Sequence, residues 1–263
     1  MRLRLRSVSR WIVALAVGLV AALPHGARAQ SQGVIRDPTV AEQYLQAAAD
    51  QERAALHLPP LRRDPALVRA AYTHALRMAG RNAISHQFAD EPDLAERGAA
   101  AGGRFSLISE NVGEGPAPIG IEEAWIHSPH HRANLLDPRV DAVGISVVVR
   151  GHQLFAVEDF AHTVRRLSLD QQEVAIAQLL EREGLSIVAP DTDARKTCAL
   201  ESGYVGRQPL FVMRFTTAGL DQLPATLNDH VATGKYSEAA VGACEVAGGG
   251  SFTAYNLAVL LYR

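Results

Sequence analysis

Three short stretches of the chain carry residue types that suit acid–base catalysis or metal binding. His86 ends the sequence Ile-Ser-His, Glu110 lies within Ser-Glu-Asn-Val, and His131 lies in the histidine-rich stretch from Trp125 to Leu136. Imidazole and carboxylate groups bind zinc and other divalent ions, and they also act as general acids and bases. The sequence has no H-E-x-x-H, no G-x-S-x-G and no glycine-rich phosphate loop. Spacing alone therefore leaves the chemistry of these residues open.

The elements that must position these residues follow an α+β order. We expect helices from Val40 to the Pro59-Pro60 pair, from Asp64-Pro65 through Met78, from Asp93 to Ala101 and leading into Trp125, then a helical turn to Leu136. Two β-rich runs, Val143 to Val149 and Leu154 to Phe160, are separated by Arg150-Gly151 and predict a hairpin. Helices followed by strands, without β-α-β alternation, argue against a parallel sheet.

The remainder of the chain has a second α+β pattern. We expect helices at Leu169 to Arg182 and Leu220 to Val231, and strands at Lys196 to Tyr204, Leu210 to Thr216, Ser237 to Val246 and Phe252 to Tyr262. Within this part of the chain a helix-strand-strand order occurs twice, but it repeats in element order only, and no duplication of residues is evident. The pattern predicts a compact α+β domain of unassigned family.

The first 29 residues have the pattern of a secretory signal peptide. Met1 to Arg10 holds four arginines and no acid, an apolar run extends from Trp11 to Leu23, and Ala27-Arg28-Ala29 provides small residues for cleavage. The apolar run is too short to span a bilayer, and no later run approaches the roughly 20 residues that a membrane helix needs. We therefore expect cleavage after Ala29, export to the periplasm or the extracellular space, and no transmembrane anchor.

Composition and charge exclude several classes of protein. The 263 residues are 48% hydrophobic and 21% charged, which argues against collagen-like, coiled-coil and disordered chains. The formal charge of the whole chain is −2, but the leader removes five of the 26 Lys and Arg and no acid, leaving 21 against 28 Asp and Glu, or −7. An acidic protein without a basic, aromatic-interleaved cluster is a poor partner for nucleic acid.

The chain has two cysteines, Cys198 and Cys244. In an exported protein an isolated pair is typical of one disulfide, and two buried free thiols are the alternative. Two cysteines cannot by themselves form a four-thiolate zinc site.

A series of motifs between Tyr44 and Phe160 resembles the bacterial branch of the CAP superfamily, which comprises cysteine-rich secretory proteins, antigen 5 and pathogenesis-related proteins and is also called the SCP domain. The matching residues, in the order of the family, are Leu67-x-x-Ala70-Ala71-x-x-His74-Ala75-x-x-Met78, Ser85-His86, Arg97, Gly102, Glu110-Asn111-Val112, Trp125-x-x-Ser128-Pro129-x-His131-Arg132-Ala133-Asn134-Leu135-Leu136, Val143-Gly144-Ile145 and Phe160. The C-terminal part of the chain falls outside this resemblance.

The resemblance implies a three-layer α-β-α sandwich with a cleft lined by two histidines and two acids. It assigns His86 and His131 to the histidine places and Glu110 to the first acidic place. Ser128 stands where animal and plant members have the second acid. A serine hydroxyl is a poor ligand for a divalent cation. His86, Glu110 and His131 could still hold zinc with an open position, or they could form a hydrogen-bonded structural cluster.

Neighbouring residues have simpler interpretations. We expect a buried core histidine at His74, and surface positions for His127 and His130. Ser128, before a proline at a helix start, is expected to act as a cap rather than as a nucleophile. The Glu158-Asp159 pair is expected at a solvated strand edge.

The sequence therefore predicts a signal peptide at 1–29, a flexible segment at 30–39, a CAP domain at 40–162, a linker at 163–168 and a C-terminal α+β domain at 169–263. We expect an exported module that binds a lipid, a peptide or an envelope component without catalysis. The alternative is a hydrolase, metal-assisted or acid–base, that acts on peptide or cell-envelope material. A third interpretation treats the cleft as an evolutionary remnant and assigns the function of the protein to the C-terminal domain.

Overall fold

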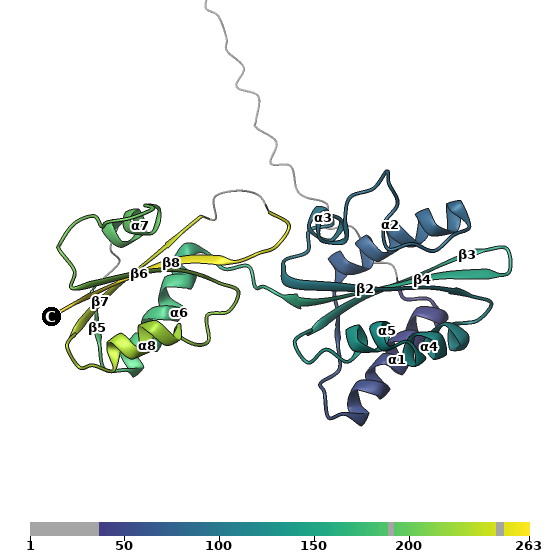
Figure 1. Ribbon diagram of the computed structural model, residues 1–263, viewed down its shortest axis with the longest axis horizontal. Helices are drawn as coiled ribbons and strands as arrows, with labels where there is room; N and C mark the ends of the chain where they lie inside the picture. Colours follow the sequence, from purple (N-terminus) through teal and green to yellow (C-terminus); the bar gives the residue numbers. More distant parts are fainter. Residues whose placement is uncertain (1–36, 189–191, 246–249) are drawn as a thin grey trace, which may run out of the picture. The chain divides into compact units, whose positions relative to one another are not determined.

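The computed structural model describes residues 37–188, 192–245 and 250–263 (Figure 1). The predicted signal peptide and its cleavage point lie outside the described residues. The described elements gather around two four-stranded sheets. Within these ranges no helix is long and apolar enough to cross a membrane.

The elements of the first sheet region, residues 40–163, alternate helices with strands. They are α1 (Val40–Ala55), β1 (Arg62–Arg63), α2 (Pro65–Arg81), α3 (Leu94–Ala100), β2 (Phe105–Gly115), α4 (Pro118–His127), α5 (Pro129–Leu135), β3 (Ala142–Arg150) and β4 (Gln153–Thr163). The strand order is β1-β3-β4-β2, so β2 is an edge strand. Only β1 pairs in parallel, and the other ladders are antiparallel.

Local sequence signals explain where these elements begin and end. The Asp64 side chain accepts hydrogen bonds from two backbone amides at the start of α2, with Pro65 in the first turn. The helix ends at Asn82, which has a left-handed φ of 54°. The β3–β4 hairpin turns at Gly151, whose φ of 60° favours glycine. The predicted helix starts and the hairpin are confirmed, whereas strand β2 was not predicted.

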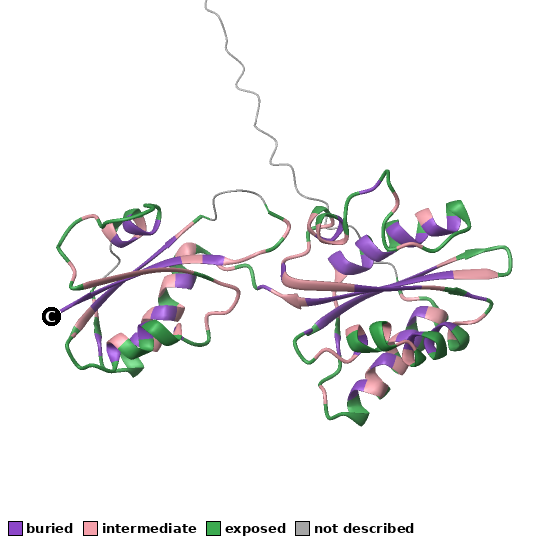
Figure 2. Ribbon diagram, viewed as in Figure 1, coloured by how far each residue is buried: buried purple, intermediate pink, exposed green. Residues whose placement is uncertain are grey.

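Helices cover both faces of the first sheet, as the predicted three-layer sandwich requires (Figure 1). One face packs against α2 through Leu67 and Met78, and the other packs against α1 and α4 through Leu45 and Trp125. Figure 2 shows the central strands buried along most of their length. Trp125 is 1% exposed, and it is therefore a core residue, as expected.

The second sheet region, residues 169–262, contains α6 (Leu169–Arg182), β5 (Ser186–Ile187), α7 (Thr192–Cys198), β6 (Phe211–Thr217), α8 (Ala225–Val231), β7 (Glu238–Cys244) and β8 (Tyr255–Tyr262). The predicted strand at 196–204 is wrong, because helix α7 occupies its first part. Ala194 and Cys198 are buried four residues apart, which is the spacing of a helix face. The predicted helix at 220–231 begins later, after Pro224.

The second sheet repeats the topology of the first. Its order is β5-β7-β8-β6, and β5 pairs in parallel with β7 as β1 does with β3. Gly144 of β3 and Gly242 of β7 occupy matching places: a Cβ at either would lie 2.1 Å from a backbone carbon of the helix above, at Leu67 in α2 or Ala194 in α7. The close approach of helix to strand therefore requires glycine in both sheets.

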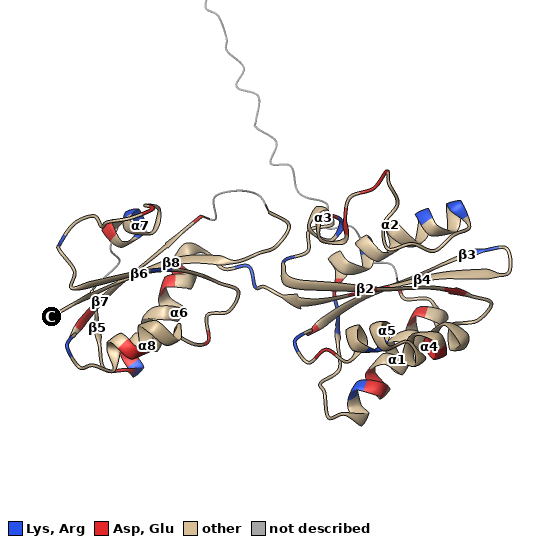
Figure 3. Ribbon diagram, viewed as in Figure 1, with Lys and Arg blue, Asp and Glu red and all other residues tan. Residues whose placement is uncertain are grey.

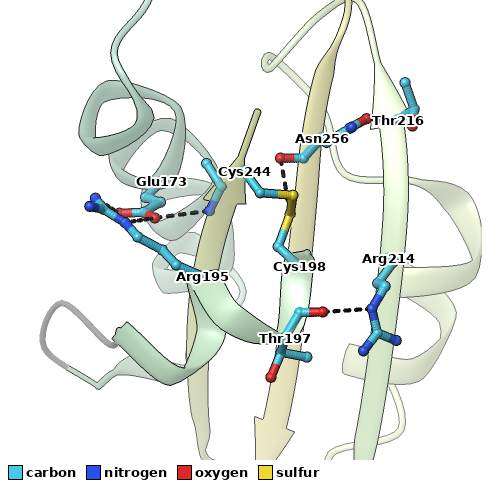
Figure 4. Close-up of a disulfide and its surroundings, with 9 residues drawn as sticks. Glu173, Arg195, Thr197, Cys198, Arg214, Thr216, Cys244 and Asn256 are labelled. Atoms are coloured by element: carbon cyan, nitrogen blue, oxygen red, sulfur yellow. Dashed lines mark hydrogen bonds and ion pairs between the residues drawn. A yellow bond between two sulfur atoms is a disulfide. The ribbon is translucent and has the colours of Figure 1, made fainter. Parts of the chain in front are cut away.

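The predicted disulfide is confirmed, and it lies at a matching point of this repeat. Cys244, two residues after Gly242, bonds to Cys198 of α7 (Figure 4). Ser146, two residues after Gly144, donates a hydrogen bond of 3.1 Å from Oγ to the Val68 carbonyl of α2. In each sheet, the residue two positions after the glycine is therefore bonded to the covering helix. The bond is a hydrogen bond in the first sheet and a disulfide in the second.

Candidate functional site

The candidate site lies over β2, the exposed edge of the first sheet. Glu110 and Asn111 are consecutive residues of this strand, so their side chains project to opposite faces. Glu110 contacts the loop between α2 and α3, which carries His86. Asn111 contacts α5, which carries His131. The Glu-Asn sequence thus joins two segments that approach the strand from opposite sides.

The Glu110 carboxylate is buried and fully engaged. It accepts hydrogen bonds from His86 Nδ1 at 3.0 Å and from Arg97 Nη2 at 2.6 Å, one on each oxygen, while it is only 5% exposed. The His86 side chain is 60% exposed. The hydrogen bond to Glu110 raises the pKa of His86 above its ordinary value, with the Glu110 charge adding to it and burial and Arg97 opposing it. The site therefore presents to solvent an imidazole whose Nδ1–H is held by a buried carboxylate.

Two buried side chains fix the loop that carries His86. Arg97 of α3 donates through Nη1 to the carbonyls of His86 and Pro92. His74 of α2 is fully buried, donates from Nε2 to the Ser85 carbonyl at 2.7 Å and pairs through Nδ1 with Glu91 at 3.1 Å. The expectation of a core histidine at position 74 is confirmed, and its partners show that it holds the loop in place.

Amide side chains fix the second histidine. Asn111 Nδ2 donates to the His131 carbonyl at 3.1 Å, and Asn134 Nδ2 donates to Asn111 Oδ1 and to the Glu110 carbonyl. The His86 and His131 rings lie 6.3 Å apart between centroids. Burial lowers the pKa of His131, and the neighbouring His86 and His130 lower it further. The pKa values of the two neighbouring imidazoles thus shift in opposite directions.

The remaining histidines and Ser128 take simpler places. His127 and His130 are exposed, as expected. Ser128 occupies the N-cap position of α5, but its side chain makes no capping hydrogen bond, so the prediction of a side-chain cap is wrong. The Ser128 backbone is extended, as the following Pro129 requires, and this alone ends α4 and starts α5.

The donors present do not fit a metal centre built on His86, Glu110 and His131. Both Glu110 oxygens already hold hydrogen bonds, and the Arg97 guanidinium beside them repels a cation. Across residues 37–188, 192–245 and 250–263, no group of three or more His, Cys, Asp or Glu side chains could hold a metal ion.

One member of this cluster was not recognised from sequence. Asp159 of β4 pairs directly with Glu110 of β2 in the ladder and is fully buried, so the expectation of a solvated strand edge at Glu158-Asp159 is wrong. Burial raises the pKa of Asp159 well above its ordinary value, the Glu110 charge adds to it, and Arg97 opposes it. The indication in the sequence was a pair of acids within an otherwise apolar β-rich run. In the structure this run is a central strand that is buried along most of its length.

Comparison with known proteins identifies this region. The model of the cysteine-rich secretory protein family, CAP, matches residues 46–160. Residues 46–160 form a CAP domain, similar to those of bacterial proteins. The CAP match includes all three residues His86, Glu110 and His131, and it ends at Phe160, before the second sheet region.

Three individual proteins are similar to part of this chain. The uncharacterized protein YkwD of Bacillus subtilis is 28% identical over 101 residues, which are 38% of this chain and 39% of YkwD. An extracellular SCP-domain protein of Bacillus anthracis superposes with a TM-score of 0.44 at 23% identity, over 47% of this chain and 40% of that one. An outer surface protein of Borrelia burgdorferi gives a TM-score of 0.45 at 21% identity, over 49% of this chain and 96% of that one. The match to YkwD spans well under half of that relative.

The second sheet region lacks the carboxyl pair of the CAP domain. In the first sheet, Gly144 pairs with Asp159, which pairs with Glu110. In the second, Gly242 pairs with Ala258, which pairs with Arg214. The matching places therefore hold an alanine and an arginine, so the repeated topology does not repeat the site.

Proposed function

We propose that the CAP domain, residues 40–162, is an exported binding module that recognises its ligand at the His86–His131 face without breaking a bond in it. The observation that carries this proposal is the full engagement of Glu110 by His86 and Arg97. A carboxylate held in this way orients His86 as a donor, and each of its oxygens already accepts a hydrogen bond, which opposes its use as a base toward water.

The polarity of the face indicates what it would bind. His86 presents a largely exposed ring with a raised pKa to solvent, and His131 adds a half-buried ring with a lowered pKa. Since Nδ1 of His86 already donates to Glu110, protonation of the ring adds a donor at Nε2, and such a donor favours carboxylates and carbonyls. Such groups are abundant in peptides and in peptide-linked envelope polymers.

A hydrolase is the second candidate, and one observation favours it. The pKa values of His86 and His131 shift in opposite directions across 6.3 Å, as those of a general acid and a general base do. An acid–base reaction on envelope or peptide material would use the same two residues.

Export is part of the proposal. The arginine-rich start, the apolar run and the Ala-x-Ala sequence support it. Mass spectrometry of the protein recovered outside the cytoplasm of an expressing cell should show a chain that begins at Gln30. Recovery only as the full-length chain inside the cell would contradict export.

The experiment that separates binding from hydrolysis uses purified peptidoglycan sacculi, vesicles of phosphatidylethanolamine with phosphatidylglycerol, and a peptide library. We expect one of these to retain the wild-type protein, and His86→Ala and His131→Ala each to weaken retention at least tenfold. His127→Ala, which changes an exposed histidine outside the site, should be retained like the wild type.

Soluble fragments in the supernatant decide the alternative. Binding without release of fragments supports the module, whereas fragments that disappear in His86→Ala and His131→Ala support the hydrolase. Equal retention of the wild type and both variants on every probe would contradict the proposed site.

A further inference from the structure

A polar pocket lies at the C-terminal end of β4, outside the histidine site. It has a volume of about 290 Å³ and is lined by residues of the β1–α2 junction, the loop before β2 and the segment after β4. Four of its lining residues are arginines, namely Arg62, Arg104, Arg165 and Arg166, and one is an acid, Asp64. Figure 3 shows basic residues at the end of β4. The pocket therefore has a net charge of +3 in a chain that is acidic once the leader is removed.

Both carboxylate oxygens of Asp64, the acid that lines the pocket, already accept hydrogen bonds from the protein. One oxygen of Asp64 accepts hydrogen bonds from the amides of Ala66 and Leu67 at the start of α2. Its other oxygen accepts one from Arg62 at 3.2 Å. Arg62 also donates to Thr163 Oγ1 at 3.2 Å. Asp64 thus offsets the charge of Arg62 and leaves the other three guanidinium groups uncompensated.

Those three arginines have no carboxylate partner in the described part of the chain. Arg104, Arg165 and Arg166 enter no ion pair there, and the Nε of Arg104 is buried without a hydrogen-bond acceptor. A buried donor without an acceptor is costly, because it has lost its water and gained nothing. Arg165 and Arg166 are exposed, so their donors can reach an arriving ligand.

We propose that this pocket is a binding site for a phosphate group, on a membrane lipid or on a free phosphorylated molecule. A guanidinium group donates two parallel hydrogen bonds to a phosphate, and a phosphate can balance more than one cation at a time. The volume is at the small end of ligand pockets, which suits a compact anion rather than a large apolar molecule. Such an anion would also supply the acceptor that Arg104 lacks.

The test measures pyrophosphate binding to the purified protein by titration calorimetry. We expect one site per chain, with an affinity that weakens as NaCl increases, because the exposed arginines are screened by salt. The double variant Arg165→Gln, Arg166→Gln should weaken binding at least tenfold, since each arginine removed takes away a charge-assisted hydrogen bond. Arg104→Gln should weaken binding as well.

The matched control removes two positive charges elsewhere. Arg182 and Lys235 are exposed residues outside the pocket, so Arg182→Gln, Lys235→Gln should bind pyrophosphate like the wild type. Absence of binding to the wild type, or equal weakening in both double variants, would overturn the proposal. Sedimentation with phosphatidylglycerol vesicles then identifies the source: a protein that pellets with them uses a lipid phosphate, and one that stays in solution uses a free phosphorylated molecule.

Discussion

Asp159 and Glu110 face each other directly across the β2–β4 ladder, on the face of the sheet that α2 covers. Both are buried, but only Glu110 accepts a hydrogen bond from the Arg97 guanidinium, and burial together with the Glu110 charge raises the pKa of Asp159 well above its ordinary value. The division of charge between the two carboxyls is therefore unequal, because the fold favours the protonated form of Asp159, while Arg97 and His86 donate to Glu110.

The first prediction concerns Asp159→Asn. A pKa raised by folding stabilises the protein fully below the ordinary value of 3.8, and that stabilisation is lost as pH rises toward the higher value in the folded state. Asparagine is neutral at every pH and has nearly the same shape. We therefore expect the free energy of unfolding to fall less between pH 4 and pH 8 in the variant, by about 1.4 kcal/mol for each unit of the removed shift.

Urea unfolding at several pH values measures this difference. Parallel pH profiles for wild type and Asp159→Asn would show that Asp159 is ionised in the folded protein, and would contradict the division of charge between the two carboxyls.

The second prediction concerns the link between Glu110 and His86. Glu110→Gln removes the hydrogen bond and the charge that raise the pKa of His86, so this pKa should fall. The change also leaves Arg97 buried without its anion, which should cost roughly 3–5 kcal/mol of stability. The titration of the His86 ring followed by NMR gives the pKa, and thermal unfolding gives the stability.

Glu114→Gln is the matched control for this variant, because Glu114 is exposed on the same strand. It should leave the His86 titration unchanged. An unchanged His86 titration in Glu110→Gln would contradict the structure of the site.

The third prediction concerns a carboxyl pair on the opposite face of the sheet. Glu122 of α4 is 3% exposed and Glu158 of β4 is fully buried, and no donor in the described ranges bonds to either. Burial, and to a lesser extent Glu52, raises the pKa of Glu122 from 4.5 to about 7. Burial and the nearby Glu122 raise the pKa of Glu158 as well. Stability from the protonated Glu122 is full below pH 4.5 and is lost as pH rises through about 7.

Glu122→Gln should remove this loss and stabilise the protein at pH 8 by about 3 kcal/mol relative to its effect at pH 4. Its exposed neighbour on α4 supplies the control, and Glu123→Gln should change stability equally at both pH values. A Glu122→Gln variant with the wild-type pH profile would show that the side chain reaches water.

The sequence predicted the role of a residue correctly where that role depends on its near neighbours in the chain. Asp64 before Pro65 marked the start of α2, and His74 within an apolar stripe marked a core histidine. Ser128 had the pattern of a cap, yet its hydroxyl makes no capping bond, because the extended backbone before a proline suffices to start α5.

Tertiary contacts decided what the sequence did not indicate. Strand β2 carries Glu110 and Asn111 in its middle, and polar residues there weaken the hydrophobic pattern by which a strand is predicted. Both residues are nevertheless buried, because other elements pack on both faces of the strand. The raised pKa of Asp159 comes from its burial and from its ladder partner Glu110, which lies 49 positions earlier in the chain. The sequence did not predict that the second sheet repeats the topology of the first. The clearest residue that the two sheets share at a matching position is a single glycine, Gly144 or Gly242.

The fourth prediction concerns the disulfide of the second sheet region. Cys198 and Cys244 are 46 residues apart, so the bond restricts a loop worth about 4 kcal/mol in the chain-entropy model. The double variant Cys198→Ser, Cys244→Ser should lose stability of this order in urea unfolding. Thiol titration of denatured, unreduced wild type should count none, and a count of two would contradict the bond.

The fifth prediction tests the matching glycines. A Cβ at Gly144 or Gly242 would lie 2.1 Å from backbone atoms of α2 or α7, which cannot give way as a flexible side chain can. Each substitution to alanine should cost about 3 kcal/mol or more. Gly120 of α4 has no atom within 4 Å of its Cβ position, so Gly120→Ala should stabilise its helix by roughly 0.5–1 kcal/mol.

The readouts of this prediction can be specific to each sheet. Trp125 lies in the core of the first region, so its fluorescence should report unfolding at lower urea in Gly144→Ala. Hydrogen exchange in α7 and β7 should accelerate in Gly242→Ala, since that strand loses its fit to the helix above. If Gly242→Ala left the protection of α7 and β7 as in the wild type, the helix would not rest on that glycine, and the equivalence of the two sheets at this position would fail.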